Sequence, residues 1–106
     1  MAYEVILDPE VAIQLDEVVD YLSTKLSSPA AAANFLDRFD EFIERLETLP
    51  YSFPQPTDRR LRNRDYRKAM VGNYLVLFKV IDDGEQSGTV HVTNLFHGSQ
   101  NYQAMI

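Results

Sequence analysis

The sequence predicts an α+β fold of order β-α-α-β-β-β, in which an antiparallel helical hairpin packs on one face of a four-stranded, mainly antiparallel sheet. Three observations lead to this fold. Residues 9–49 hold two apolar stretches at helical spacing, each introduced by a capping residue and a proline. Residues 65–96 hold three strand-like segments joined by turn residues. Residues 2–7 alternate apolar and polar side chains, which is typical of a strand.

The N-terminal half is predicted to contain one strand and two helices. After the strand at about residues 2–7, Asp8-Pro9 begins a helix to about residue 27, because Asp can cap the free amides and Pro suits the first helical position. Ser28-Pro29 repeats this pattern and begins a second helix that runs to about Leu49. Two or three residues separate the helices, so we expect them to fold back on each other as a hairpin.

The C-terminal half is predicted to contain three strands. Gly72-Asn73 is a strong signal for a two-residue hairpin between Asp65–Val71 and Tyr74–Ile81. The second of these strands is apolar on both faces, as expected for a central strand, and Thr89–Phe96 forms the last strand. The sheet face away from the helices is expected to be partly open and to receive a partner or substrate.

A tight turn at Gly72-Asn73 also fixes the pairing register of the hairpin. Counting from the turn, Arg67 lies opposite Phe78, and Tyr66 lies opposite Lys79. Because side chains alternate along a strand, Arg67 and Lys79 are predicted to point to opposite faces unless a bulge intervenes.

Length and composition restrict the class of protein. The 106 residues, 45% of them hydrophobic, suit one globular domain spanning residues 1–106. The absence of cysteine excludes disulfides, thiolate zinc sites and a catalytic thiol. The N-terminus does not resemble a signal peptide, and no apolar stretch approaches the roughly 20 residues that span a bilayer, so we expect a cytoplasmic protein without membrane contact.

The net charge of −6 is unevenly distributed. Residues 1–57 carry 11 acidic and 3 basic residues, whereas residues 58–106 carry 5 acidic and 7 basic residues. Six of the basic residues fall within residues 59–68. Such a cluster can attract a polyanion locally, or it can be a solvated loop that pairs with the acidic helices. Charge alone leaves both interpretations open.

Several short motifs carry a family resemblance when taken in order. They are Tyr3–Leu7 followed by Pro9, the run Ser28-Pro29-Ala30-Ala31, Leu49-Pro50, Asp65-Tyr66-Arg67, Asn73–Phe78, Val80-Ile81-Asp82, Val90-His91-Val92 and the end from His97-Gly98 to Tyr102. In this order and spacing the chain resembles the RelE/ParE toxins of type II toxin–antitoxin, or plasmid stabilisation, systems. The resemblance covers nearly the whole chain.

The resemblance implies a toxin that is neutralised by a cognate antitoxin protein and needs no cofactor. Some members of this family cleave mRNA on the ribosome without a metal, and others poison DNA gyrase. Nuclease members commonly carry an arginine where this chain has Leu75. The family's C-terminal motif often has two arginines and an acid where this chain has Ser99-Gln100-Asn101. Three alternatives therefore stay open, namely a ribosome-dependent endoribonuclease, which we place first, a gyrase inhibitor, and a degenerate member that still binds its antitoxin.

The candidate site residues follow from the chemistry of RNA cleavage, which needs a base, an acid and cations at the phosphate. The candidates for catalysis are Arg67, His97, Lys79 and Tyr102, and the candidates for binding RNA phosphates are Arg62, Arg64 and Lys68. Arg67 could instead pair with the acidic helices, and His97 could bond backbone at a strand end. His91 is expected to be structural or at the surface, and two histidines without a carboxylate partner make a poor metal site.

Overall fold

The computed structural model describes residues 2–85 and 87–98. In chain order its elements are β1 (Tyr3–Leu7), α1 (Pro9–Asp20), the π-helical turn η1 (Tyr21–Lys25), α2 (Pro29–Thr48), the 3₁₀ turn η2 (Pro50–Ser52), α3 (Arg59–Asn63), β2 (Tyr66–Val71), β3 (Tyr74–Asp82) and β4 (Gly88–His97). The predicted α+β order is confirmed, and α3 is an additional short helix that the sequence did not reveal.

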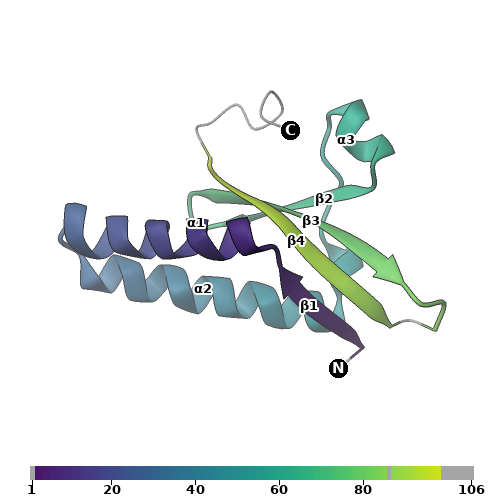
Figure 1. Cartoon of the computed structure of the whole chain (residues 1–106), viewed down its shortest axis with the longest axis horizontal. Coiled ribbons are helices and arrows are strands. Elements are labelled where there is room, and N and C mark those ends of the chain that lie inside the picture. The colour runs from purple at the N-terminus through teal and green to yellow at the C-terminus, as the bar shows by residue number, and fades with distance from the viewer. Residues whose placement is uncertain (1, 86, 99–106) are drawn as a thin grey trace.

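The four strands form one mixed sheet in the order β1-β4-β3-β2 (Figure 1). β1 runs parallel to β4, and the two remaining pairs are antiparallel. The register counted from the turn is confirmed, since Arg67 lies opposite Phe78 and Tyr66 lies opposite Lys79. Gly72 has a φ of 59°, a conformation that favours glycine at this turn. The β3–β4 register shifts between Leu77 and Phe78, which marks a bulge.

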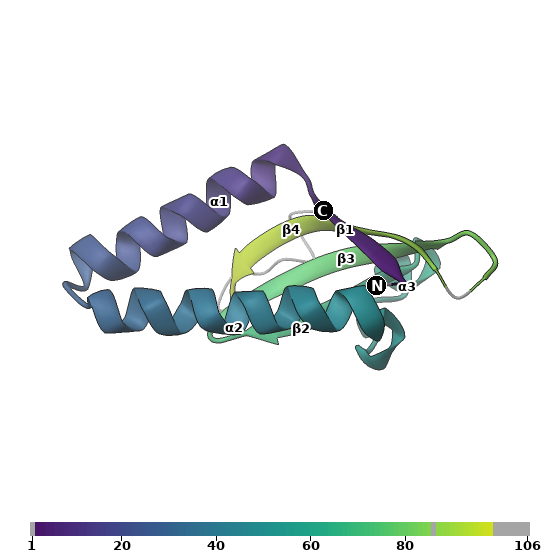
Figure 2. The ribbon, with the colours of Figure 1, turned by 90° about the horizontal axis from the view of Figure 1, so that it is seen from below.

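The main core lies between the sheet and the two long helices, which cover one face (Figure 2). Aromatic side chains dominate it. Phe42 of α2 contacts Phe78 of β3 edge-on, with ring centroids 5.9 Å apart, and Phe53 meets both rings at 5.4 and 5.6 Å. Such edge-to-face pairs add stability beyond the area they bury, so they fix how α2 lies on the sheet. In the described part of the chain, no helix is both long and apolar enough to cross a membrane.

The face of the sheet turned away from α1 and α2 is called the open face below. It carries a second, smaller apolar cluster of Leu75, Leu77 and Phe96, against which Tyr66 packs. Met70 on the same face is 59% exposed, so the cluster is only partly covered. α3 lies on this side of the molecule and packs against β2 (Figure 1).

The two predicted helix caps differ in outcome. Ser28 caps α2 as predicted, because its hydroxyl accepts a hydrogen bond from the amide of Ala31 at 3.1 Å. The prediction for Asp8 was wrong, since its side chain makes no capping hydrogen bond to α1. The carboxylate lies instead 3.9 Å from Nδ1 of His91 on β4. The Asp8 side chain therefore lies beside β4 and does not cap the helix.

Candidate functional site

Arg67 lies on the helix-covered face of β2, where the loop after α2 returns to the sheet. Its Nη1 donates a hydrogen bond to the backbone oxygen of Phe53 at 2.7 Å, and its guanidinium carbon lies 4.8 Å from the ring centroid of Tyr51. It also lines a cavity of about 230 Å³ with Gln55 and Asp65. Among the described residues, Arg67 forms no ion pair with the acidic helices, and its contacts hold the loop against the sheet.

Tyr51 and Tyr3 share the carboxylate of Asp82 at the end of β3. The Tyr3 hydroxyl donates to one oxygen at 2.8 Å, and the Tyr51 hydroxyl donates to the other. The hydrogen bond to Asp82, followed by burial, raises the pKa of Tyr51 to about 12 and also raises the pKa of Tyr3. This contact fastens η2 to β1 and β3, and it places Tyr51 under Arg67.

His97 lies at the other end of the same face. Its ring meets the ring of Tyr74 edge-on at 5.3 Å, and both line a groove of about 340 Å³ together with Glu17 and Tyr21 from the helical hairpin. The amide of Gly98 donates to the backbone oxygen of Asn73 at 2.7 Å, which ties the end of β4 to the hairpin turn. The pairing of β4 with β3 therefore positions His97 beside α1.

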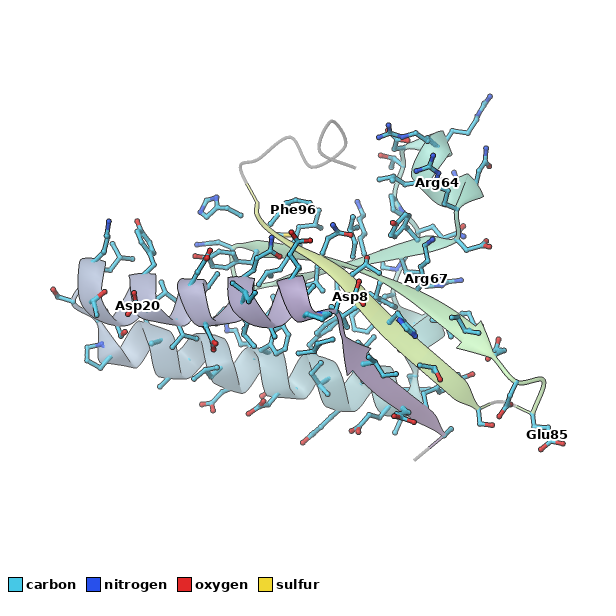
Figure 3. The ribbon with its side chains drawn as sticks, viewed as in Figure 1. Asp8, Asp20, Arg64, Arg67, Glu85 and Phe96 are labelled. Atoms are coloured by element: carbon cyan, nitrogen blue, oxygen red, sulfur yellow. The ribbon has the colours of Figure 1, made fainter. Side chains whose placement is uncertain are left out.

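Arg67 and His97 are not brought together. Arg67 is level with Phe78 and His97 is level with Tyr74, four residues along β3 and two strands across. At about 3.4 Å per residue and about 4.8 Å per strand, their backbones are roughly 17 Å apart. Figure 3 shows Phe96, the neighbour of His97, well away from Arg67 along the sheet.

Lys79 points to the open face and Arg67 to the helix-covered face, so the prediction that they point to opposite faces is confirmed. Its ammonium lies 4.5 Å from the ring centroid of Tyr66 on β2. His91 on β4 is the register partner of Lys79 on the other side, and Nδ1 of His91 lies 3.9 Å from Asp8. Tyr66, Lys79 and His91 thus form a row across three adjacent strands, which we call the cross-strand row.

Sequence reasoning did not single out Tyr66 and His91 as partners of Lys79 in a site. The signal for Tyr66 was present in the hairpin register. His91 could not be placed by counting, because the turn between β3 and β4 is long and the register shifts at the Leu77/Phe78 bulge.

The remaining candidates lie near the cross-strand row or outside the described residues. Arg62 lies on α3, and Arg64 follows it as the C-terminal cap; both are exposed. Lys68 lies on the open face two residues beyond Tyr66, opposite Leu77. Tyr102 falls outside the described residues. Within residues 2–85 and 87–98, no group of three or more His, Cys, Asp or Glu side chains could hold a metal ion.

Comparison with known protein families matches residues 5–102 to the model described as "ParE toxin of type II toxin-antitoxin system, parDE". Comparison with curated proteins gives no match. The family match spans nearly the whole chain and includes both long helices, β2, β3, β4 and the last three residues of β1. A toxin of such a system has a cognate antitoxin as its partner. The chain belongs to the ParE toxin family and is the toxin component of a type II toxin–antitoxin system.

Proposed function

We propose that this toxin arrests growth by binding and inhibiting DNA gyrase, without cutting nucleic acid itself. The observation that carries the proposal is the separation of the groups expected to perform cleavage. A general acid or base must lie within hydrogen-bond reach, about 2.6–3.2 Å, of the atom it serves. Arg67 and His97 lie at opposite ends of one face, and Lys79 lies on the other.

The residue at the position of the family's nuclease arginine supports the same proposal. Leu75 is only 6% exposed and packs with Leu77 and Phe96 in the apolar cluster of the open face. A phosphate at this position would meet hydrocarbon instead of a cation, and transition-state charge would not be stabilised there. A binding toxin has no need of such a cation.

A supercoiling assay tests the proposal. Purified toxin added to gyrase and relaxed plasmid should block supercoiling, and addition of the cognate antitoxin should restore it. The His97→Gln variant should inhibit as strongly as the wild type, because His97 has no catalytic role under this proposal. Normal supercoiling with toxin in large excess over gyrase would overturn the proposal.

The cross-strand row favours a second candidate, ribosome-dependent mRNA cleavage at a site other than the predicted one. Lys79 could hold a phosphate, and His91, its register partner on the open face, could transfer a proton. In a translation reaction this candidate predicts cut transcripts with the wild type and intact transcripts with His91→Gln. Intact transcripts with the wild type would eliminate it. If expression of this chain without its antitoxin does not arrest growth, both candidates are contradicted. The chain would then be a degenerate member of the family.

A further inference from the structure

The exposed arginines beside β2 are held in a fixed position by the fold. Arg59, Arg60, Arg62 and Arg64, called the arginine arm below, are all exposed. Leu61 between them is fully buried, and the Asp58 carboxylate caps α3 by accepting from the amides of Arg60 and Leu61 at 2.8 and 3.2 Å. An apolar anchor and a cap therefore present three cations on a helix too short to be stable alone, and a fourth, Arg64, at its C-terminal cap.

Three of these cations are available for a ligand. Arg59, Arg62 and Arg64 form no ion pair with any residue that the structure describes. Guanidinium groups bind phosphate oxygens through paired hydrogen bonds, which a nearby carboxylate would otherwise occupy. Asp65, exposed at the junction to β2, is the nearest acidic residue along the chain after Arg64.

The arginine arm continues into the cross-strand row. Arg64 is followed by Asp65 and then by Tyr66, the first residue of β2, whose ring lies under the Lys79 ammonium. At about 4.8 Å between strands the row extends for about 10 Å, and a five-residue helix adds about 7 Å. Figures 1 and 3 show α3 and Arg64 on the side of the sheet opposite the two long helices. The arginine arm and the cross-strand row together make a polar strip with cations along its length, which is called the strip from here on.

The rest of the molecule repels a polyanion. α1 and α2 contain nine of the 16 acidic residues and only two basic residues, Arg38 and Arg45. The net charge of −6 makes the free toxin a poor ligand for nucleic acid at long range. Binding through the strip is therefore favoured when another protein already holds the nucleic acid close to it.

We propose that the arginine arm and the cross-strand row bind the phosphodiester backbone of the DNA that gyrase holds while the toxin is on the enzyme. The inference rests on the proposed gyrase function and adds a second contact to it. Arg59, Arg62 and Arg64 supply about three phosphate contacts, and Lys79 extends them over the sheet. Phosphate contacts of this kind position a protein on nucleic acid without reading its sequence.

An acidic segment of the antitoxin is the competing occupant of the strip. A peptide partner is usually anchored by apolar side chains in a pocket. The groove that offers such anchoring is lined by Val18, Tyr74 and Leu95, on the helix-covered side of the sheet. Within residues 59–64, which contain the arginine arm, the one apolar side chain is Leu61, and it is buried. The strip therefore suits an extended polyanion better than an anchored peptide.

The test compares two variants of equal net charge. The arm variant carries Arg59→Gln, Arg62→Gln and Arg64→Gln. The control variant carries Lys25→Gln, Arg38→Gln and Arg45→Gln, which removes three exposed cations from the helical hairpin. Circular dichroism first checks that both variants fold. Affinity of each labelled toxin for gyrase is then measured with and without bound DNA, between about 50 and 200 mM salt.

With DNA on gyrase, the arm variant should bind at least about tenfold more weakly than the control variant, and its dependence on salt should be less steep. Loss of three phosphate contacts lowers the slope of log K against log salt by about 2–3. Without DNA the two variants should bind alike. Equal affinity of the two variants in the presence of DNA would overturn the inference. If the arm variant loses as much affinity without DNA as with DNA, the inference is also overturned, because the arm then contacts the gyrase protein.

Two further measurements separate the remaining outcomes. If the arm variant binds gyrase and DNA normally but loses affinity for the antitoxin, the strip is an antitoxin contact and the inference is overturned. If only binding of a single-stranded RNA oligonucleotide depends on the arm, the backbone recognised is that of RNA. If wild-type toxin binds gyrase in neither state, the proposed function fails first and this inference fails with it.

Discussion

Arg67 contacts Tyr51 and not His97, although all three lie on the helix-covered side of the sheet. The Arg67 guanidinium carbon lies 4.8 Å from the Tyr51 ring centroid, whereas His97 meets Tyr74 four residues along β3. The arginine is therefore part of the junction between the loop and the sheet.

Double-mutant cycles on the free energy of unfolding should reproduce this geometry. Arg67→Gln combined with Tyr51→Ala should show a coupling of about 0.5–1 kcal/mol, because the two side chains stack. Arg67→Gln combined with His97→Gln should be additive within about 0.3 kcal/mol, since the two residues lie two strands and four residues apart on the sheet. A larger coupling between Arg67 and His97 than between Arg67 and Tyr51 would contradict the structure.

The parts of this site that could be predicted are those set by residues close together in the sequence. The register of the β2–β3 hairpin follows from the turn at Gly72-Asn73, so the opposite directions of Arg67 and Lys79 were predictable. β3 is apolar on both faces, so alternation alone could not tell which face the helices cover. Without that knowledge, the neighbours of Arg67 could not be predicted.

α3 was missed for a different physical reason. It has five residues, of which one, Leu61, is buried, and a single apolar residue produces no helical periodicity. The signal that was present is Asp58, a favoured capping residue directly before the basic run. In the same way, the sequence showed that Asp8 could cap α1, but it could not show that His91 would lie beside that carboxylate.

The Tyr51–Asp82 contact predicts a dependence of stability on alkaline pH. The pKa of Tyr51 is raised to about 12 from the ordinary value of 10.0. Its hydrogen bond therefore contributes fully below pH 10 and is lost as the pH rises from 10 to 12. Tyr51→Phe should cost less than about 1 kcal/mol at neutral pH, because the side chain is half exposed, and should flatten the decline between pH 10 and 12.

Denaturant unfolding at several pH values measures this effect. Asp82→Asn should flatten the same decline, because it removes the carboxylate that raises the pKa of both Tyr51 and Tyr3. If the single variants lose stability across this pH range as steeply as the wild type, the contact does not persist in solution.

Leu46 and Leu49 form a matched pair for testing the core. Leu46 is fully buried at the end of α2, and Leu49 just beyond the helix is 58% exposed. Leu46→Ala should lower the free energy of unfolding by about 2–5 kcal/mol, since it leaves a cavity among aromatic rings. Leu49→Ala should change it by less than about 0.5 kcal/mol. Equal losses, measured by urea unfolding, would show that α2 ends differently.

The two helix starts allow a similar comparison. Ser28→Ala should cost about 1 kcal/mol, because its hydroxyl is the acceptor for the amide of Ala31. Asp8→Ala should cost less, since the Asp8 side chain makes no capping hydrogen bond and lies beside His91 instead. Thermal and denaturant unfolding of both variants would decide the order, and a greater loss at Asp8 would mean that it caps α1 in solution.

Gly88 is the residue at which β4 begins, and the backbone leaves no room for a side chain there. Its φ is 154°, and a Cβ atom would lie 2.1 Å from the backbone oxygen of Ile81 on the paired strand. Because that oxygen belongs to the β3 backbone, it cannot rotate away as a flexible side chain would. Gly88→Ala must therefore shift the end of β3 or break the pairing between Asp82 and Gly88.

Gly84 in the same connection provides the control. Its φ is 94°, so alanine is strained there too, but a Cβ atom would meet nothing within 4 Å. Gly84→Ala should therefore cost only the backbone strain, of order 1–3 kcal/mol, whereas Gly88→Ala should cost more because the clash is added to it. Hydrogen exchange should report the difference locally, through faster exchange of the amides near the end of β3 in the Gly88 variant alone. If both variants lose the same stability and keep the same exchange pattern, Gly88 does not approach β3 as closely as the structure indicates.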